Sequence, residues 1–259
     1  MPSELHAERR GPALVLTISD PATRNTLSEQ VFTAGVEALN VAESDPEVRC
    51  IVLRGEGNHF CAGGNLQRLQ SSRLAHPDVQ GAMLDRFNSF VEALRVFPKP
   101  VIAAVEGAAA GGGFSLALAC DLIVAAADAR FVLAYGRIGL SPDGGATWQL
   151  MQRVPRAKLL QWLWLSEPVS AQELQAFGVV SWVTDSGQAL SRALEVAEQL
   201  AQGAPNAQAS AKELVNGWPQ RTLTEQLQQE RQHFLDNLFH PNNAEGLNAF
   251  LEKRSPRFN

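Results

Sequence analysis

The sequence has few of the residues and patterns that mark secreted or metal-binding proteins. Its three cysteines, Cys50, Cys61 and Cys120, are odd in number and lack the spacing of a metal site. We therefore expect buried, reduced thiols in a cytoplasmic protein. The five histidines show no metal spacing either, so no metal ligands are predicted.

Long apolar runs and basic runs are also absent. The most apolar stretch, residues 107–120, is short, rich in glycine and bracketed by Glu106 and Asp121. The first ten residues mix both charge signs around no apolar core, so a secretory signal is not expected. The net charge is −5. These absences predict no membrane and no nucleic-acid partner, while scattered basic residues remain available for a phosphorylated ligand.

The 259 residues can bury a large core, and a hydrophobic content of 45% is ordinary for a globular protein. Short strands alternate with helices in the first part of the chain, and helices dominate the rest. This order predicts an α/β core over residues 1–203 and a C-terminal helical region over residues 204–259. The predicted strands cover residues 13–18, 48–53, 101–105, 122–124 and 131–133, and the clearest helices cover residues 81–96 and 114–120.

At three predicted helix starts, a Ser or Thr residue stands three positions before a glutamate. This is the spacing of a capping box, in which the hydroxyl begins a helix. The pairs predict helix starts at Thr26 with Glu29, Ser170 with Glu173, and Thr222 with Glu225.

Two glycine-rich segments, residues 59–66 (HFCAGGNL) and 106–114 (EGAAAGGGF), follow predicted strands. Glycine lets the backbone approach a ligand closely, and N–H groups at a helix start lack internal partners. One N–H group from each segment could hold an oxygen that gains negative charge, as in an oxyanion hole. Either segment alone is also explained by a tight strand-to-helix turn. Neither has the spacing of a P-loop or a Rossmann motif.

Four further motifs accompany these segments, at residues 24–27 (RNTL), 120–122 (CDL), 138–143 (IGLSPD) and 245–254 (EGLNAFLEKR). Together they resemble the crotonase superfamily, also called the enoyl-CoA hydratase/isomerase family, over almost the whole chain. The resemblance implies a spiral of ββα units with a C-terminal helical region that trimerises. It also implies an acyl-CoA substrate that brings its own coenzyme A, no separate cofactor, and a homotrimer or dimer of trimers.

The same resemblance gives roles to particular residues. The N–H groups of Gly64 and Gly112 would be the oxyanion-hole donors. The substrate and its CoA would be bound by Arg24 near the phosphates, the Ala62 carbonyl at the adenine amine, Gly63, Asn65 and Leu66 beside the hole, and Phe250 and Lys253 from the C-terminal part.

The two glutamates that supply acid and base in the hydratases of this family are missing. Ser115 stands at one of their positions, and Tyr135, the only tyrosine in the chain, stands at the other. We expect Ser115 to be a helix residue that faces the pocket. Tyr135 is expected to line the pocket, or to orient the acyl group.

Asp143 is the carboxylate that remains among the matched positions. From its local pattern, between Pro142 and two glycines that precede a helix, it is most simply an N-cap. The family comparison favours another role, because its setting resembles the phenylacetate-pathway ring-epoxide isomerases and related enoyl-CoA isomerases, in which this carboxylate moves a proton. An aryl-CoA dehalogenase branch uses an aspartate here as a nucleophile. Apolar surroundings would raise the pKa of the carboxyl and make it a useful base.

These observations predict an acyl-CoA isomerase in which Gly64 and Gly112 hold an enolate oxygen while Asp143 moves a proton. The enzymatic alternative is an enoyl-CoA hydratase with a non-standard acid/base set. A catalytically silent CoA-thioester binder is the alternative from another class. It is favoured by Ser115 and Tyr135, and disfavoured by Asp143 and by the two intact glycine segments. An RNA-binding role is disfavoured by the acidic balance.

Overall fold

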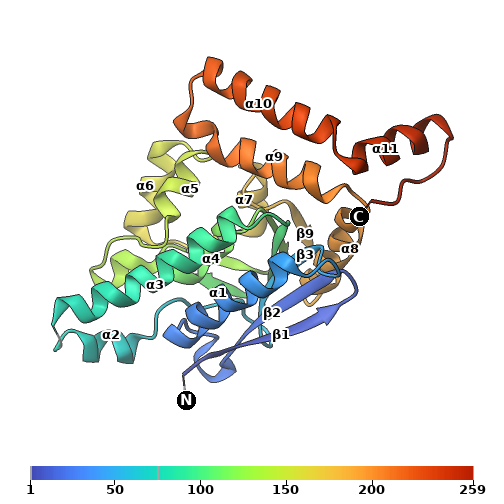
Figure 1. Cartoon of the computed structure of the whole chain (residues 1–259). Helices are drawn as coiled ribbons and strands as arrows, with labels where there is room; N and C mark the ends of the chain where they lie inside the picture. The colour runs from blue at the N-terminus through green and yellow to red at the C-terminus, as the bar shows by residue number, and fades with distance from the viewer. Residues whose placement is uncertain (1, 75, 259) are drawn as a thin grey trace.

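A six-stranded sheet forms the centre of the molecule (Figure 1). The computed structural model describes residues 2–74 and 76–258. The strand order is β1-β2-β3-β4-β6-β9, with β1 antiparallel to β2 and each later neighbouring pair parallel. These strands are β1 (Glu4–Arg10), β2 (Ala13–Ser19), β3 (Cys50–Gly55), β4 (Val101–Val105), β6 (Leu122–Ala126) and β9 (Trp182–Thr184). A second sheet has the order β5-β7-β8 and contains β5 (Ala108–Ala110), β7 (Arg130–Val132) and β8 (Val169–Ser170).

One face of the large sheet is covered by α8 (Ala189–Ala201). Val196 of this helix belongs to the same apolar cluster as Val15 and Val52 of the sheet. Parallel strands that are apolar on both sides need such a cover on each face, and Val15 and Val52 would otherwise meet water.

The opposite face carries the larger core, which includes residues of α1 (Glu29–Ser44), α3 (Pro77–Val96) and α4 (Gly112–Ala119). Phe32 of α1 packs against Phe87 of α3, with their ring centroids 5.2 Å apart. Aromatic pairs at this separation stabilise a contact by about 1 kcal/mol beyond their buried area. This packing holds the helix faces that form one wall of the candidate site.

Short helices connect these layers, and a run of longer helices ends the chain. The connecting helices are η1 (Pro21–Thr23), α2 (Leu66–Ser72), η2 (Ala134–Ile138), α5 (Ala146–Met151), α6 (Arg156–Leu165) and α7 (Ala171–Ala176). The last run consists of α9 (Pro205–Gly217), η3 (Trp218–Gln220), α10 (Leu223–Leu238) and α11 (Pro241–Leu251). Figure 1 shows α10 on the outer side of α9, away from the large sheet.

An ion pair attaches α9 to the core. Lys212 Nζ lies 2.8 Å from Asp121 Oδ2, and Asp121 also accepts a hydrogen bond from the Val101 N–H. This pair joins segments 91 residues apart in the sequence, because the chain returns over the sheet before α9 begins.

Predicted helix starts agree with the structure at two of three positions. The Ser170 and Thr222 side chains each accept a hydrogen bond from the backbone three residues later. The prediction for Thr26 is wrong, because Ser28 caps α1. Thr26 lies two residues too early for this role, and its hydroxyl is instead 2.8 Å from that of Thr23.

The strand β1 is not predicted from the sequence. Its residues, ELHAERR, are almost all exposed and show no apolar alternation. The strand exists because its backbone pairs with β2 along seven residues at the edge of the sheet. Charged side chains are common on such edges, since they discourage pairing with another chain.

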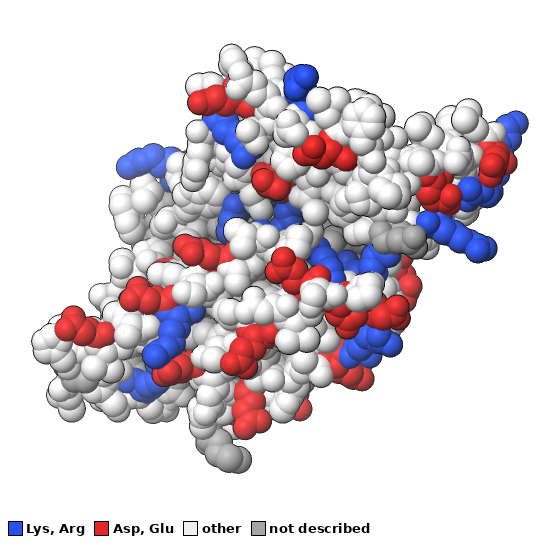
Figure 2. Space-filling model, in the orientation of Figure 1, with Lys and Arg blue, Asp and Glu red and all other residues white. Residues whose placement is uncertain are grey.

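The surface drawn in Figure 2 carries basic and acidic side chains interspersed over the helices and the sheet edge. No helix within residues 2–74 and 76–258 is long and apolar enough to cross a membrane. Cys50, Cys61 and Cys120 are all buried and free, as predicted.

Candidate active site

The two glycine segments lie side by side. The Cys61 N–H donates to the Ala108 carbonyl at 3.0 Å, and the Ala110 N–H donates back to the Cys61 carbonyl at 2.9 Å. Each segment continues for three residues beyond this bridge of Cys61 to Ala109, and reaches Gly64 and Gly112 respectively. The two short parallel pieces therefore deliver both glycines to one place.

Gly64 and Gly112 both line the same cavity. Gly112 is the first residue of α4, where an N–H group has no partner within the helix. Among the described residues, neither glycine N–H donates to a backbone carbonyl outside the regular elements. Both donors are thus available to a bound oxygen, and the positive end of the α4 dipole favours negative charge there.

Gly63 keeps the two segments close. Its φ is +85°, and a Cβ atom built on it would lie 2.5 Å from the Ala110 carbonyl oxygen and 3.2 Å from the Gly112 nitrogen. A side chain at residue 63 would therefore push the second segment away from the first. Cys61 lies beneath them, and burial raises the pKa of its thiol to about 12, so it stays neutral.

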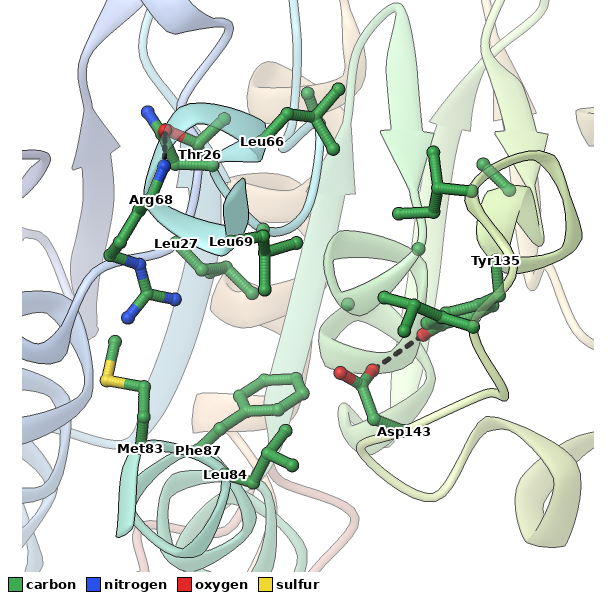
Figure 3. A pocket seen from close by; sticks show the side chains of 18 of the residues that line it. Thr26, Leu27, Leu66, Arg68, Leu69, Met83, Leu84, Phe87, Tyr135 and Asp143 are labelled. Carbon is green, nitrogen blue, oxygen red and sulfur yellow. Dashed lines mark hydrogen bonds between the residues drawn. The ribbon is translucent and has the colours of Figure 1, made fainter. Parts of the chain in front are cut away.

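The cavity has a volume of about 690 Å³ and is mostly apolar at its walls. Its residues come from the turn before α1, the segment that enters α2, the middle of α3, the start of α4 and the stretch from η2 to Asp143. The larger apolar side chains that line it are Leu27, Phe32, Leu66, Leu69, Met83, Leu84, Phe87, Ile138 and Leu140. Figure 3 shows Leu27, Leu69 and Phe87 between the left wall and Asp143.

Asp143 lies in the loop between η2 and α5, and its carboxylate is bound by a tyrosine. The Tyr135 hydroxyl donates to Asp143 Oδ1 at 2.7 Å, the bond drawn in Figure 3. Behind it, Ser115 Oγ is 2.9 Å from the Tyr135 oxygen and 3.0 Å from the Asp143 carbonyl oxygen. The three positions that the sequence comparison singled out therefore form one hydrogen-bonded group.

Burial raises the pKa of the Asp143 carboxyl above its usual range, and the hydrogen bond from Tyr135 partly offsets this by stabilising the charged form. The pKa of Tyr135 is raised as well, first by burial and then by the neighbouring Asp143 charge. Tyr135 thus remains a neutral donor at physiological pH. The pair combines a carboxylate of increased basicity with a hydroxyl that holds it in place.

Two sequence-based expectations are corrected here. Asp143 is not the cap of α5, because the helix begins at Ala146, its N-cap is Gly145, and no side chain caps it. The two glycines that follow Asp143 turn the chain and leave its carboxylate free to bond Tyr135. Ser115 does not face the cavity: it is fully buried, and its hydroxyl lies behind Tyr135.

The positions expected to bind CoA fall into two groups. Arg24 lies beside Ala62, since the Ala62 N–H donates to the Arg24 carbonyl at 2.9 Å, and the Arg24 side chain is exposed. Ala62, Asn65 and Leu66 line the cavity. The Asn65 side chain caps α2 by accepting from the Arg68 N–H at 3.0 Å, which gives it a structural role in addition.

Phe250 and Lys253 form the second group and do not line the cavity of their own chain. Phe250 belongs to α11, and its side chain is 81% exposed. Figure 1 places α11 at the opposite end of the molecule from α2. Within a single chain, these two residues are therefore not brought to the other candidate site residues.

Several cavity residues are missed by the sequence reasoning. Met83, Leu84 and Phe87 follow a helical spacing that also fits an ordinary core face, so the pattern alone does not separate wall from core. Arg68 is another omission. A cation in the first turn of a helix, among apolar neighbours, is the only sequence signal that marks it. No group of His, Cys, Asp and Glu that could hold a metal occurs among residues 2–74 and 76–258.

Comparisons with known proteins agree with this geometry. A family model described as enoyl-CoA hydratase/isomerase matches residues 8–259. The 1,2-epoxyphenylacetyl-CoA isomerase of Escherichia coli (strain K12) is 34% identical over 246 residues, which cover 95% of this chain and 94% of the relative. The 2,3-dehydroadipyl-CoA hydratase of the same strain is 34% identical over 256 residues, which cover 99% and 98%. The crystal structure of an enoyl-CoA hydratase from Polaromonas sp. JS666 has a TM-score of 0.98 and 51% identity, with 99% and 100% coverage.

The fold and the matched length define a crotonase-type acyl-CoA enzyme. The chain belongs to the enoyl-CoA hydratase/isomerase family. Its relatives are named for isomerisation and for hydration alike, so their names alone do not select the reaction.

Proposed function

We propose that this protein is an acyl-CoA isomerase that uses Asp143 as its single acid/base group. The observation that most supports this proposal is the composition of the cavity wall. Among the described residues that line the cavity, Asp143 is the only carboxylate. Moving a proton between two carbons of one substrate needs one such group. Adding water needs one group to activate water and another to deliver a proton at the next carbon.

The proposed steps follow from the geometry. The thioester oxygen binds between the N–H groups of Gly64 and Gly112. The Asp143 carboxylate takes a proton from a carbon next to the unsaturation, and the electrons released form an enolate whose negative oxygen the two donors stabilise. The enolate then accepts the same proton from the Asp143 carboxyl at another carbon, and the double bond ends in its new position. Substrate and product have the same composition, and Asp143 is again ionised.

Residues near the proposed oxyanion hole and residues of the C-terminal part would bind the CoA part of the substrate. Ala62 lines the cavity and Arg24 is hydrogen-bonded to it, so the two would meet the adenine and the phosphates. Phe250 and Lys253 would act on the CoA bound to a neighbouring chain of a trimer, since they lie far from their own cavity. A relative named 1,2-epoxyphenylacetyl-CoA isomerase supports the isomerase assignment.

Hydration remains the second candidate, because other relatives are named hydratases. In that reaction the Tyr135 hydroxyl would have to serve as the second proton-transferring group. Its raised pKa disfavours release of its proton to solvent, which makes it a poorer acid/base group than the missing glutamate.

The test compares reaction products with and without Asp143. The protein is assayed with 2-enoyl, 3-enoyl and aromatic epoxide CoA thioesters, and the products are identified by mass and NMR. We predict that a rearranged product of unchanged mass forms faster than a hydrated one. Asp143→Asn should lower turnover by about a hundredfold or more, because the base is lost.

Asn can still accept the Tyr135 hydrogen bond, so Asp143→Asn should keep the fold and the affinity for CoA. Thermal melting and calorimetry check both. Full activity of Asp143→Asn on the best substrate would leave Asp143 without a catalytic role. A product heavier by one water, formed faster than any isomer, would select the hydratase.

A further inference from the structure

The cavity wall opposite Asp143 contains an arginine that the proposed chemistry does not use. Arg68 lies in the first turn of α2 and is only partly exposed. Figure 3 shows its guanidinium extending beside Met83, on the other side of the cavity from the Asp143 and Tyr135 pair. Met83 and Phe32, which also line the cavity, are nearly fully buried, so this part of the wall belongs to the interior.

The Arg68 guanidinium is partly buried and makes no side-chain hydrogen bond or ion pair with the described residues. Its Nε atom is buried and has no hydrogen-bond partner among the described residues. Burial lowers the pKa of Arg68, and Glu29 is the one carboxylate that acts in the opposite direction. Glu29, however, is bound to Arg86 at 3.1 Å on the surface. Partial burial of a cation without a counter-charge costs stability, and a bound anion would offset this cost for Arg68.

Arg137 provides a contrast within the same cavity. It also lines the wall, but its guanidinium donates to the Ser166 carbonyl at 2.5 Å. The Arg137 side chain thus has a structural hydrogen bond, whereas the Arg68 donors are available to a ligand. Arginine binds carboxylates through two parallel N–H groups, a geometry that gives both affinity and direction.

We propose that Arg68 binds a carboxylate at the far end of the acyl group, so that the preferred substrates are CoA thioesters of dicarboxylic acids. This inference rests on the proposed function only in placing the thioester at Gly64 and Gly112. From that point the acyl group passes Leu27, which lies within 3.1 Å of a Cβ atom built on Gly112. Leu27, Leu69 and Met83 then give it an apolar path toward Arg68.

A phosphate of CoA is the other possible anion, but the surroundings favour the acyl carboxylate. Arg24, which is expected near the phosphates, is exposed and does not line the cavity. Arg68 is instead flanked by apolar side chains that suit the hydrocarbon part of an acyl group. The two sources predict different binding patterns, and the following experiment separates them.

The experiment measures equilibrium affinity by calorimetry, without turnover. The probes are CoA itself and saturated acyl-CoA thioesters of several chain lengths, each length ending either in a methyl group or in a carboxylate. Wild type is compared with Arg68→Met, which keeps the length and apolar stem but removes the charge. Arg86→Met is the matched control, because Arg86 is a neighbouring surface arginine that does not line the cavity.

We expect Arg68→Met to weaken the binding of the tightest carboxylate-ended thioester by about tenfold to a hundredfold. This is the effect of losing a charge-assisted hydrogen bond. Binding of CoA and of the methyl-ended thioesters should stay the same, and Arg86→Met should bind all probes like wild type. Arg68→Lys should retain part of the preference for a carboxylate. This outcome holds or fails whether or not the protein proves to be an isomerase.

Two results would overturn the proposal. Equal weakening of CoA and of both thioester series in Arg68→Met would assign Arg68 to a phosphate. Unchanged binding of every probe in a variant with a wild-type melting curve would leave Arg68 as a solvated side chain. If Arg68→Met does not fold, the same comparison is made with Arg68→Gln, which keeps a polar end.

Discussion

Asp143 and Tyr135 are joined by a hydrogen bond, and each changes the acid strength of the other. Tyr135 occupies a position that carries a glutamate in the hydratases this chain resembles, yet it cannot replace that glutamate as a base, since burial keeps it protonated. What it does is donate a hydrogen bond to Asp143 at 2.7 Å. That bond fixes the carboxylate and lowers its pKa, against the larger effect of burial. Tyr135 is therefore a positioning residue in the proposed reaction.

Tyr135→Phe should make the enzyme more sensitive to acid. Asp143 must be ionised to take a proton, so kcat/KM falls as the pH falls through its pKa. Loss of the Tyr135 bond removes a contribution that lowers this pKa, and the pKa therefore rises. The fall of kcat/KM then begins at a higher pH than in wild type, with a loss of about tenfold at the acid end. The measurement is a pH profile of kcat/KM for both proteins.

Ser115→Ala serves as the control for this profile. It removes a hydrogen bond to Tyr135 but none to the Asp143 carboxylate, so its shift should be smaller. A Tyr135→Phe profile that is lower at every pH without moving along the pH axis would contradict the positioning role. That pattern would instead fit a direct part in proton transfer.

The two glycine segments show how short elements create a site at their ends. The bridge between Cys61 and Ala109 fixes their register, and each proposed donor is the third residue after the bridge. Gly63 allows the approach, because its backbone has a positive φ and no Cβ that would contact Ala110. The proposed oxyanion hole thus depends on the contact between the segments as much as on the two proposed donors.

Gly63→Ala should lower stability by about 2 kcal/mol and lower turnover by tenfold or more, because the added Cβ strains the backbone and moves Gly112. Gly57→Ala is the matched control. Gly57 also has a positive φ, +68°, but a Cβ there meets nothing within 4 Å. It should lose stability by about 1 kcal/mol and keep full turnover. Chemical denaturation and steady-state kinetics measure both effects, and equal turnover in the two variants would argue against a role for the Gly63 contact.

On the scale of the whole molecule, the C-terminal helices have much apolar surface that the chain itself does not bury. On α10, the side chains of Leu223, Leu227, Phe234 and Leu238 recur at helical spacing and are all exposed. Monomers rarely leave such a stripe in water. Together with the distance of Lys253 from its own cavity, it supports the proposed trimer or dimer of trimers.

Leu227→Glu combined with Phe234→Glu should therefore break the assembly into smaller species, since it places charge in an apolar interface. Sedimentation measures the mass, and Gln228→Glu, on the same helix, is the control. The dissociated variant should also bind CoA several-fold more weakly, because Phe250 and Lys253 of a neighbouring chain would be lost. A wild-type protein that is monomeric at micromolar concentration would refute the assembly.

Local patterns were sufficient to predict many elements and the linear positions of the candidate site. The buried strand at residues 101–105 was predictable from its apolar run, and the helix start at Thr222 from its capping spacing. The order of the glycine segments and Asp143 along the chain likewise indicates the family. These features depend on residues close in sequence, and the physics of helix caps and buried strands acts over that range.

Contacts between distant segments were decided only by the tertiary structure. The edge strand β1 owes its form to β2 and not to its own side chains. The partner of Asp143 is Tyr135 and not the start of α5, because the chain folds back through two glycines before the helix begins. The sequence by itself therefore determined the family and selected Gly64, Gly112 and Asp143 for the candidate site, but not the cavity walls around them. The directions of those side chains, including the unpartnered Arg68, follow from packing among segments far apart in the chain, which local patterns do not encode.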